Sequence, residues 1–105
     1  MTLKVMGVND FPPLHKATTE EIERRRRIQL SVAAYAYEIA GHPVMDDFAF
    51  DQLAYRIDKR VMTGHPVMDE FFLFCFSPMT GMWIHDHPEL SRIAELFSTY
   101  KHWRN

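Results

Sequence analysis

Residues 32–57 read VAAYAYEIAGHPVMDDFAFDQLAYRI, and this stretch decides the fold. It combines the end of an amphipathic helix, a Gly-His-Pro turn, and a second helix that opens on the acidic pair Asp46 and Asp47. Glycine ends a helix because it tolerates the left-handed conformation, and acidic side chains stabilise the next helix N-terminus. The stretch therefore predicts two helices joined by a tight turn, with Asp46 as the N-cap of the second.

The first helix is expected to begin at Thr18, which forms a capping box with Glu21, and to end near Ala40. Its apolar side chains recur at helical spacing, at Ile28, Val32, Tyr35 and Ile39. Extending this stripe backwards meets Arg24 and Arg25, which are costly to bury. We therefore expect the first turns of this helix to project beyond the core.

The second helix is expected to end by about residue 60. Residues 68–76 could form a buried strand or a short buried helix, and the acidic pair at 69–70 favours the helix. Residues 82–84 read as extended, and Pro88 begins a last helix of about residues 88–100.

A chain of 105 residues, with 47% hydrophobic and 25% charged residues, is typical of one globular domain. We predict a mainly α, single-domain bundle of three to four helices over residues 17–105. An extended arm, residues 1–16, would pack Val5, Phe11 and Leu14. The net charge of −2 excludes general attraction to nucleic acid or to an anionic membrane.

Cys75 is the single cysteine, which excludes a disulfide framework, and its apolar neighbours predict a buried thiol. The first residues resemble no signal peptide, and no stretch is long enough to span a membrane. We expect a cytoplasmic protein.

One phrase occurs twice: GHPVMDDF at 41–48 and GHPVMDEF at 64–71. It combines a helix stop, a rigid proline and an acidic helix start. The repeat is either one turn chemistry used twice or a pair of pseudo-equivalent ligand sites.

Residues 35–57 resemble the N-terminal helical (Ia) subdomain of bacterial NAD-dependent DNA ligases. That subdomain typically reads Tyr-x-Tyr-His, a few residues, Pro, then Asp-x-x-Tyr-Asp-x-Leu. The matching residues, in order, are Tyr35, Tyr37, Pro43, Asp47, Asp51 and Leu53. The remainder of the chain is similar to small stand-alone phage and prophage proteins described as ligase-related, which implies the cytoplasm of a phage host.

The resemblance implies a site for the nicotinamide mononucleotide half of NAD. Tyr37, Asp47 and Asp51 fall on its binding positions, and Phe50 stands where the family has tyrosine. Glu38 stands where the family has histidine, and a carboxylate there repels a phosphate. The Lys-x-Asp-Gly motif of nucleotidyl transfer is absent from the sequence, so no catalysis is expected.

These residues also have structural interpretations. Asp47 and Asp51 share a helix face, where they could bind a ligand or only stabilise a helix end. Tyr35 fits the core stripe, so Tyr37 is the better ligand contact. Phe50 belongs to the core unless a pocket opens at the turn.

Four consecutive arginines, Arg24, Arg25, Arg26 and Arg27, span one helical turn. They form either a solvated, Glu-paired helix end or a contact for a phosphate or an acidic protein partner. His85, Asp86 and His87 suggest a metal site, but no third ligand has a fixed spacing; capping of the last helix is the simpler interpretation, and no metal is predicted.

Two functions follow. In the first, the protein is a phage-type interaction protein that binds and inhibits a host or phage protein complex. In the second, it binds nicotinamide mononucleotide, NAD or ADP-ribose between its first two helices. No membrane or direct nucleic-acid partner is expected, and self-association is possible.

Overall fold

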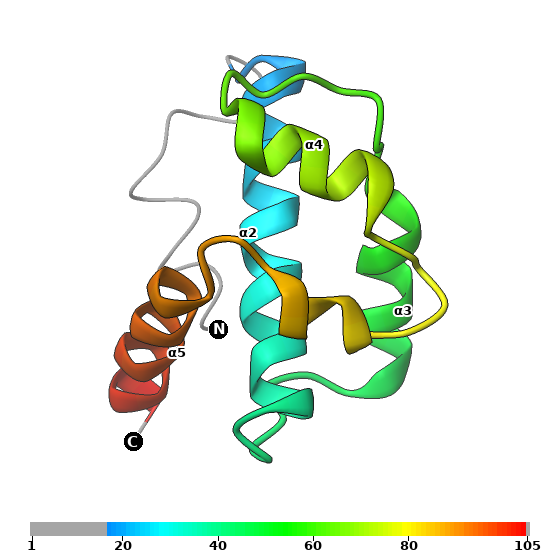
Figure 1. Ribbon diagram of the computed structural model, residues 1–105. Helices are drawn as coiled ribbons and strands as arrows, with labels where there is room; N and C mark the ends of the chain where they lie inside the picture. Colours follow the sequence, from blue (N-terminus) through cyan, green and yellow to red (C-terminus); the bar gives the residue numbers. More distant parts are fainter. Residues whose placement is uncertain (1–16, 105) are drawn as a thin grey trace.

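The computed structural model describes residues 17–104, and side chains up to residue 100 (Figure 1). Its elements are α2 (Thr19–Glu38), α3 (Asp47–Arg56), α4 (Pro66–Phe74), the 3₁₀ helix η2 (Met82–Asp86) and α5 (Leu90–Arg104). The described residues contain no strand, so the mainly α prediction is confirmed. The predicted arm with Val5, Phe11 and Leu14 lies outside the described residues. Within them, no helix is long and apolar enough to cross a membrane.

Helix α2 is the central element, with α3 and α5 on opposite sides of it (Figure 1). It packs against α3, η2 and α5. The predicted capping box is present: Glu21 N–H donates to Thr18 Oγ1 at 3.1 Å, and Thr18 N–H donates to Glu21 Oε1 at 3.0 Å. The chain then turns at Gly41, whose φ of 65° lies in the left-handed region that favours glycine.

The helix that follows begins as predicted and ends within the predicted limit of about residue 60. Asp46 is the N-cap of α3, and its side chain accepts from Ala49 N–H at 2.8 Å. The helix stops at Arg56, and the carbonyls of residues 58 and 61 in the segment that follows accept from Arg27 on α2. The ambiguous apolar segment is helical, as α4, and its N-terminal proline, Pro66, occupies the first turn.

The aromatic core joins α4 to η2. The Trp83 ring centroid lies 5.2 Å from that of Phe76 and 5.7 Å from that of Phe72. Phe72 and Ile84 are fully buried. The sequence predicted that residues 82–84 are extended, and this prediction is wrong. A 3₁₀ turn places Trp83 and Ile84 together against α2. The prediction that the Cys75 thiol is buried is also wrong, because Cys75 is exposed just beyond α4.

A buried ion network fixes the N-terminal half of α2. Arg27 Nε donates to Glu23 Oε2, and Arg27 Nη1 donates to Asp69 Oδ1, each at 2.9 Å. Arg27 Nη2 donates to the carbonyl oxygens of Asp58 and Val61, both at 2.9 Å. Four guanidinium N–H donors thus have acceptors, and Arg27 is only 4% exposed.

The carboxylates of this network bind backbone as well. Asp58 N–H donates to Glu23 Oε2 at 3.0 Å. Thr63 donates to Asp69 twice, through its N–H at 2.9 Å and through its hydroxyl at 2.7 Å. Burial opposes ionisation of Asp69, but the Thr63 hydrogen bonds and the Arg27 charge outweigh it and lower its pKa.

The expectation that the first turns of α2 project beyond the core is therefore wrong. The stripe continues toward the N-terminus through Glu23 and Arg27, which are buried as an ion pair, rather than through apolar side chains. A charged pair can occupy a core position when every donor and acceptor is matched.

Replacing Arg27 by methionine, which keeps the aliphatic stem, should destabilise the protein by about 3–5 kcal/mol because two buried carboxylates lose their counter-charge. Urea unfolding followed by tryptophan fluorescence measures the loss. The matched control is Arg60→Met, because the Arg60 side chain is 87% exposed in its pair with Asp58; its effect should stay within about 0.5 kcal/mol. Equal effects of the two substitutions would contradict the importance of the network.

Candidate functional site

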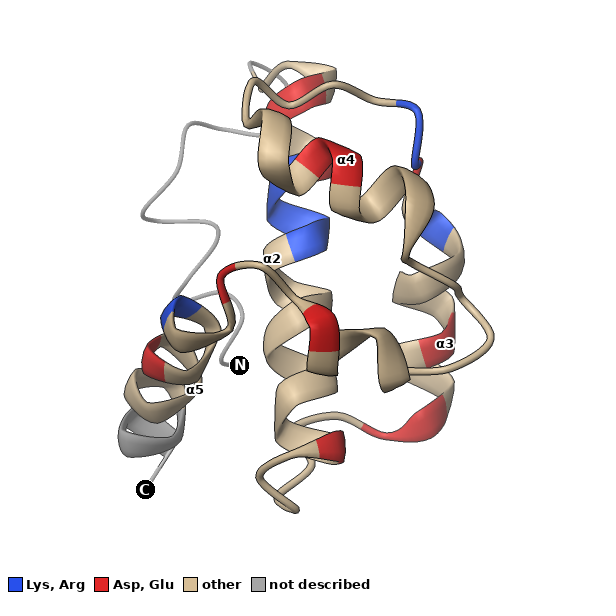
Figure 2. Ribbon diagram, in the orientation of Figure 1, with Lys and Arg blue, Asp and Glu red and all other residues tan. Residues whose placement is uncertain are grey.

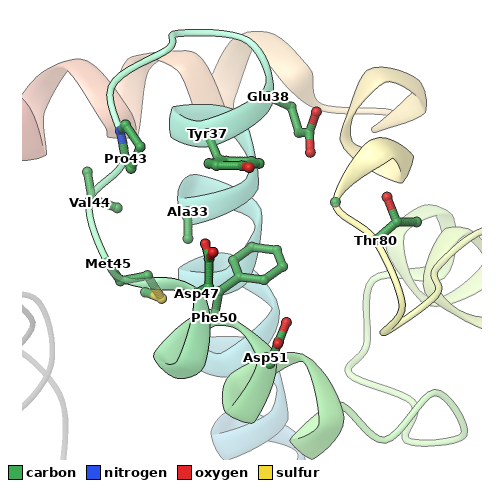
Figure 3. Close-up of a pocket in the computed structure, with 11 residues that line it drawn as sticks. Ala33, Tyr37, Glu38, Pro43, Val44, Met45, Asp47, Phe50, Asp51 and Thr80 are labelled. Carbon is green, nitrogen blue, oxygen red and sulfur yellow. The ribbon is translucent and has the colours of Figure 1, made fainter.

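The turn between α2 and α3 encloses a cavity of about 290 Å³. Its walls come from the last turns of α2, the first two turns of α3, the connecting loop and the segment that precedes η2 (Figure 3). The lining residues are Ala33, Tyr37, Glu38, Pro43, Val44, Met45, Asp47, Phe50, Asp51, Thr80 and Gly81. All four predicted ligand residues, Tyr37, Asp47, Phe50 and Asp51, are therefore brought together.

Two rings form the aromatic walls of this cavity. Tyr37 is 55% exposed, whereas Tyr35 is half-buried and packs against Phe97, with ring centroids 5.5 Å apart. This confirms the prediction that Tyr35 belongs to the core and Tyr37 does not. Phe50 is half-buried: one side of it packs against the core, and it also lines the cavity. In Figure 3 the Asp47 and Phe50 side chains point into the space beside the Tyr37 ring.

The electrostatic character of the cavity is acidic. Its lining includes three carboxylates, Glu38, Asp47 and Asp51, and no lysine or arginine. Figure 2 shows acidic residues where α2 leads into α3, whereas the N-terminal half of α2 carries both acidic residues and arginines. The arrangement can accept hydrogen bonds and stabilise a positive charge, and it disfavours a phosphate.

Sequence reasoning missed part of this site. Thr80 and Gly81 reach it from a loop about thirty residues downstream, and no spacing rule links them to α2 or α3. A Cβ atom added at Gly81 would lie 3.4 Å from Glu38 Cγ and 3.4 Å from Phe50 Cζ. Gly81 therefore lets this loop approach both side chains closely.

The four-arginine surface is not assembled as predicted. Arg27 is buried and cannot reach a partner. Arg24 donates to the Thr63 carbonyl, and Arg26 pairs with Glu23 at 3.4 Å and donates to the Arg56 carbonyl. Arg25 is half-buried and has an interaction of its own. Arg27 is thus closed to a partner, whereas Arg24 is exposed, with the Thr63 carbonyl as its acceptor.

His87 makes a turn contact between η2 and α5 and bonds no N–H group in the described part of α5, so the expected cap of the last helix is not formed by it. His87 is 6% exposed, and its Nδ1 accepts from Glu89 N–H at 3.0 Å, just before α5 begins. Among the described residues, no group of three or more His, Cys, Asp or Glu side chains is placed to hold a metal ion. Burial lowers the pKa of His87 to about 4, against a smaller opposing effect of Glu89.

Comparison with family models, curated proteins and solved structures finds no match for this chain. The ligase resemblance therefore rests on the matched positions themselves.

The depressed pKa of His87 predicts a pH dependence of stability. Between pH 6.5 and pH 4 the unfolded chain binds a proton at His87 that the folded chain does not, so the free energy of unfolding falls as the pH is lowered. This contribution should reach about 3 kcal/mol, because one pKa unit corresponds to about 1.4 kcal/mol. Urea unfolding at several pH values measures it.

The control is His87→Asn, whose side-chain oxygen can still accept from Glu89 N–H. This variant should lose stability less steeply between pH 6.5 and pH 4 than the native chain. Parallel pH profiles of the two proteins would show that His87 titrates normally.

Proposed function

We propose that this chain is a non-catalytic binding protein whose cleft between α2 and α3 holds a nicotinamide-type nucleoside or nucleotide. One observation carries the proposal: the positions that the ligase resemblance assigns to the nicotinamide nucleotide, Tyr37, Asp47, Phe50 and Asp51, line a single cavity. Its volume of about 290 Å³ lies just below the range of small-molecule sites, which begins at about 300 Å³.

The two side-chain types suit the two halves of such a ligand. The rings of Tyr37 and Phe50 offer faces on which a flat heterocycle can stack. Asp47 and Asp51 are acceptors for ribose hydroxyls or for the carboxamide N–H₂ group. Both aspartates lie on the first two turns of α3, so one rigid element would orient the ligand.

The charge of the cavity narrows the class of ligand. A pyridinium ring carries a positive charge that three carboxylates and two aromatic faces favour. A phosphate inside the cavity would face Glu38 with no lysine or arginine among the lining residues to offset it. We expect the nucleoside to enter the cavity and any phosphate to remain outside it.

Isothermal titration with nicotinamide riboside, nicotinamide mononucleotide, NAD and ADP-ribose tests this function. Nicotinamide riboside should bind more tightly than its phosphorylated form. The double variant Asp47→Asn with Asp51→Asn should lose at least about tenfold in affinity, because each carboxylate makes charge-assisted hydrogen bonds.

The matched control is Asp46→Asn, which removes one charge at the same helix end, outside the cavity, and keeps an N-cap side chain. It should leave binding unchanged. Absence of heat with all four ligands would refute the proposal. An equal loss of affinity in Asp46→Asn and in the double variant would refute it as well.

A second function, an interaction protein that inhibits a host or phage protein complex, is favoured by an exposed apolar surface. Phe74 at the end of α4 is 74% exposed, and Met79 in the following loop is 79% exposed. Tyr55 on α3 contacts Met79, with its Oη 3.0 Å from Met79 Sδ. Exposed large apolar side chains of this kind are enriched in protein contacts.

Phe74→Ser with Met79→Ser should release a protein partner that co-purifies with the native chain from host-cell lysate, because the substitutions remove the two most exposed large apolar side chains of the described residues. Quantitative mass spectrometry of the captured material measures the loss. Met62→Ser with Val67→Ser is the control, since these side chains are both 55% exposed and adjoin the other end of α4. If the partner is lost from both double variants, or is retained by both, the result would argue against this surface.

A further inference from the structure

A second cavity, separate from the cleft between α2 and α3, lies between the N-terminal half of α2, the start of α4 and the start of α5. Its volume is about 210 Å³. Most of its wall is apolar and comes from all three helices: Ile28, Met68, Phe72, Ile93 and Leu96. Apolar walls of this kind hold the hydrocarbon part of a small ligand.

Ser31 is the unexplained polar group in this wall. It is 1% exposed, and its Oγ has no hydrogen-bond partner among the described residues. A buried hydroxyl without a partner costs free energy, and most buried hydroxyls in proteins are paired. Since Ser31 lines the cavity, an oxygen atom of a ligand could pair with it.

His87 lines the same cavity and adds a second buried donor. Its Nδ1 accepts from Glu89 N–H, so the proton of the neutral imidazole is assigned to Nε2. Burial keeps the pKa of His87 near 4, and the ring is therefore neutral at physiological pH. Ser31 and His87 together suit an uncharged oxygen atom rather than a second carboxylate.

The charged residues of the wall include two arginines that lie outside the buried Arg27 network. Arg24 and Arg92 are both exposed residues that line the cavity. The acidic residue of the wall, Glu89, has its Oε2 3.0 Å from His65 Nε2. Arg27 also lines the cavity, but Glu23 and Asp69 neutralise it.

We propose that this cavity binds a small amphipathic carboxylate. The carboxylate pairs with Arg92 and Arg24 at the mouth, and the apolar body fills the space between α2, α4 and α5. An oxygen at the far end of the ligand meets Ser31 and His87. This site is independent of the nicotinamide cleft, because the two cavities share no lining residue.

The probe is 4-hydroxyphenylacetate, which has a carboxylate, an apolar ring and a distal hydroxyl. It is titrated into the full chain and followed by NMR chemical shifts and by thermal shift. Two analogues separate its parts: phenylacetate lacks the distal oxygen, and 4-hydroxyphenethyl alcohol lacks the charge. We expect saturable binding of the probe and binding at least about fivefold weaker for each analogue.

Two variants connect binding to the cavity. Ser31→Ala removes the unpartnered hydroxyl, so it should weaken binding of the probe without lowering the thermal stability of the free protein. Arg92→Gln should weaken binding of the carboxylate probe and leave binding of the alcohol unchanged. Ser91→Ala, at an exposed neighbouring position on α5, is the control and should have no effect.

Three results would overturn the proposal: no saturable binding of 4-hydroxyphenylacetate, equal binding of the uncharged alcohol, or binding that survives both Ser31→Ala and Arg92→Gln. None of these results bears on the nicotinamide cleft, and its Asp47 and Asp51 variants should bind the probe normally.

Discussion

The buried guanidinium of Arg27 is the interaction on which the rest of the structure depends. It must be satisfied because an unpaired charge in the core costs several kcal/mol. Glu23 lies one turn away on the same helix, but Asp69 and the carbonyls of residues 58 and 61 come from the segment beyond α3. A buried pair contributes little net stability relative to apolar packing, whereas a missing partner is costly. The network therefore penalises every arrangement in which α4 does not meet α2 at Asp69.

The repeated phrase shows how strongly this constraint acts on local structure. In the second copy the helix begins at Pro66, and the aspartate of the phrase, Asp69, is 4% exposed and bound to Arg27. In the first copy the helix starts later, and the equivalent residue, Asp46, is an exposed N-cap. The phenylalanine that follows differs as well: Phe48 is 71% exposed, whereas Phe71 is buried. Nearly identical octapeptides thus fold differently because only one of them faces a buried arginine. The two copies line different cavities: the first lines the acidic cavity, and His65 and Met68 of the second line the cavity between α2, α4 and α5.

Features that depend on local chemistry could be predicted from the sequence. The capping box at Thr18, the N-cap at Asp46 and the outward position of Tyr37 each follow from neighbouring residues, and each is present. The failures involve partners distant in the chain. Arginines at 24–27 read as solvated because the residues that bury Arg27 follow it by thirty or more positions. Partners distant in the chain also determine the 3₁₀ turn at residues 82–84, which packs in the aromatic core. They likewise determine the position of Thr80 and Gly81 in the cavity wall. Hydrophobic periodicity carries no information about such contacts.

One long helix supplies a wall to both cavities, and the charged side chains that it contributes to them differ. Arg24 and Arg27 line the cavity at α4 and α5, whereas Glu38 lines the cavity at α3. The ion network holds the N-terminal half against α4, while the capped turn at Gly41 and Asp46 holds the C-terminal half against α3. Glu38 stands where the resemblance to the ligase subdomain implies a histidine, and the acidic cavity has no basic side chain among the described residues of its wall. A cavity lined by three carboxylates and two aromatic rings favours a positively charged ring over a phosphate.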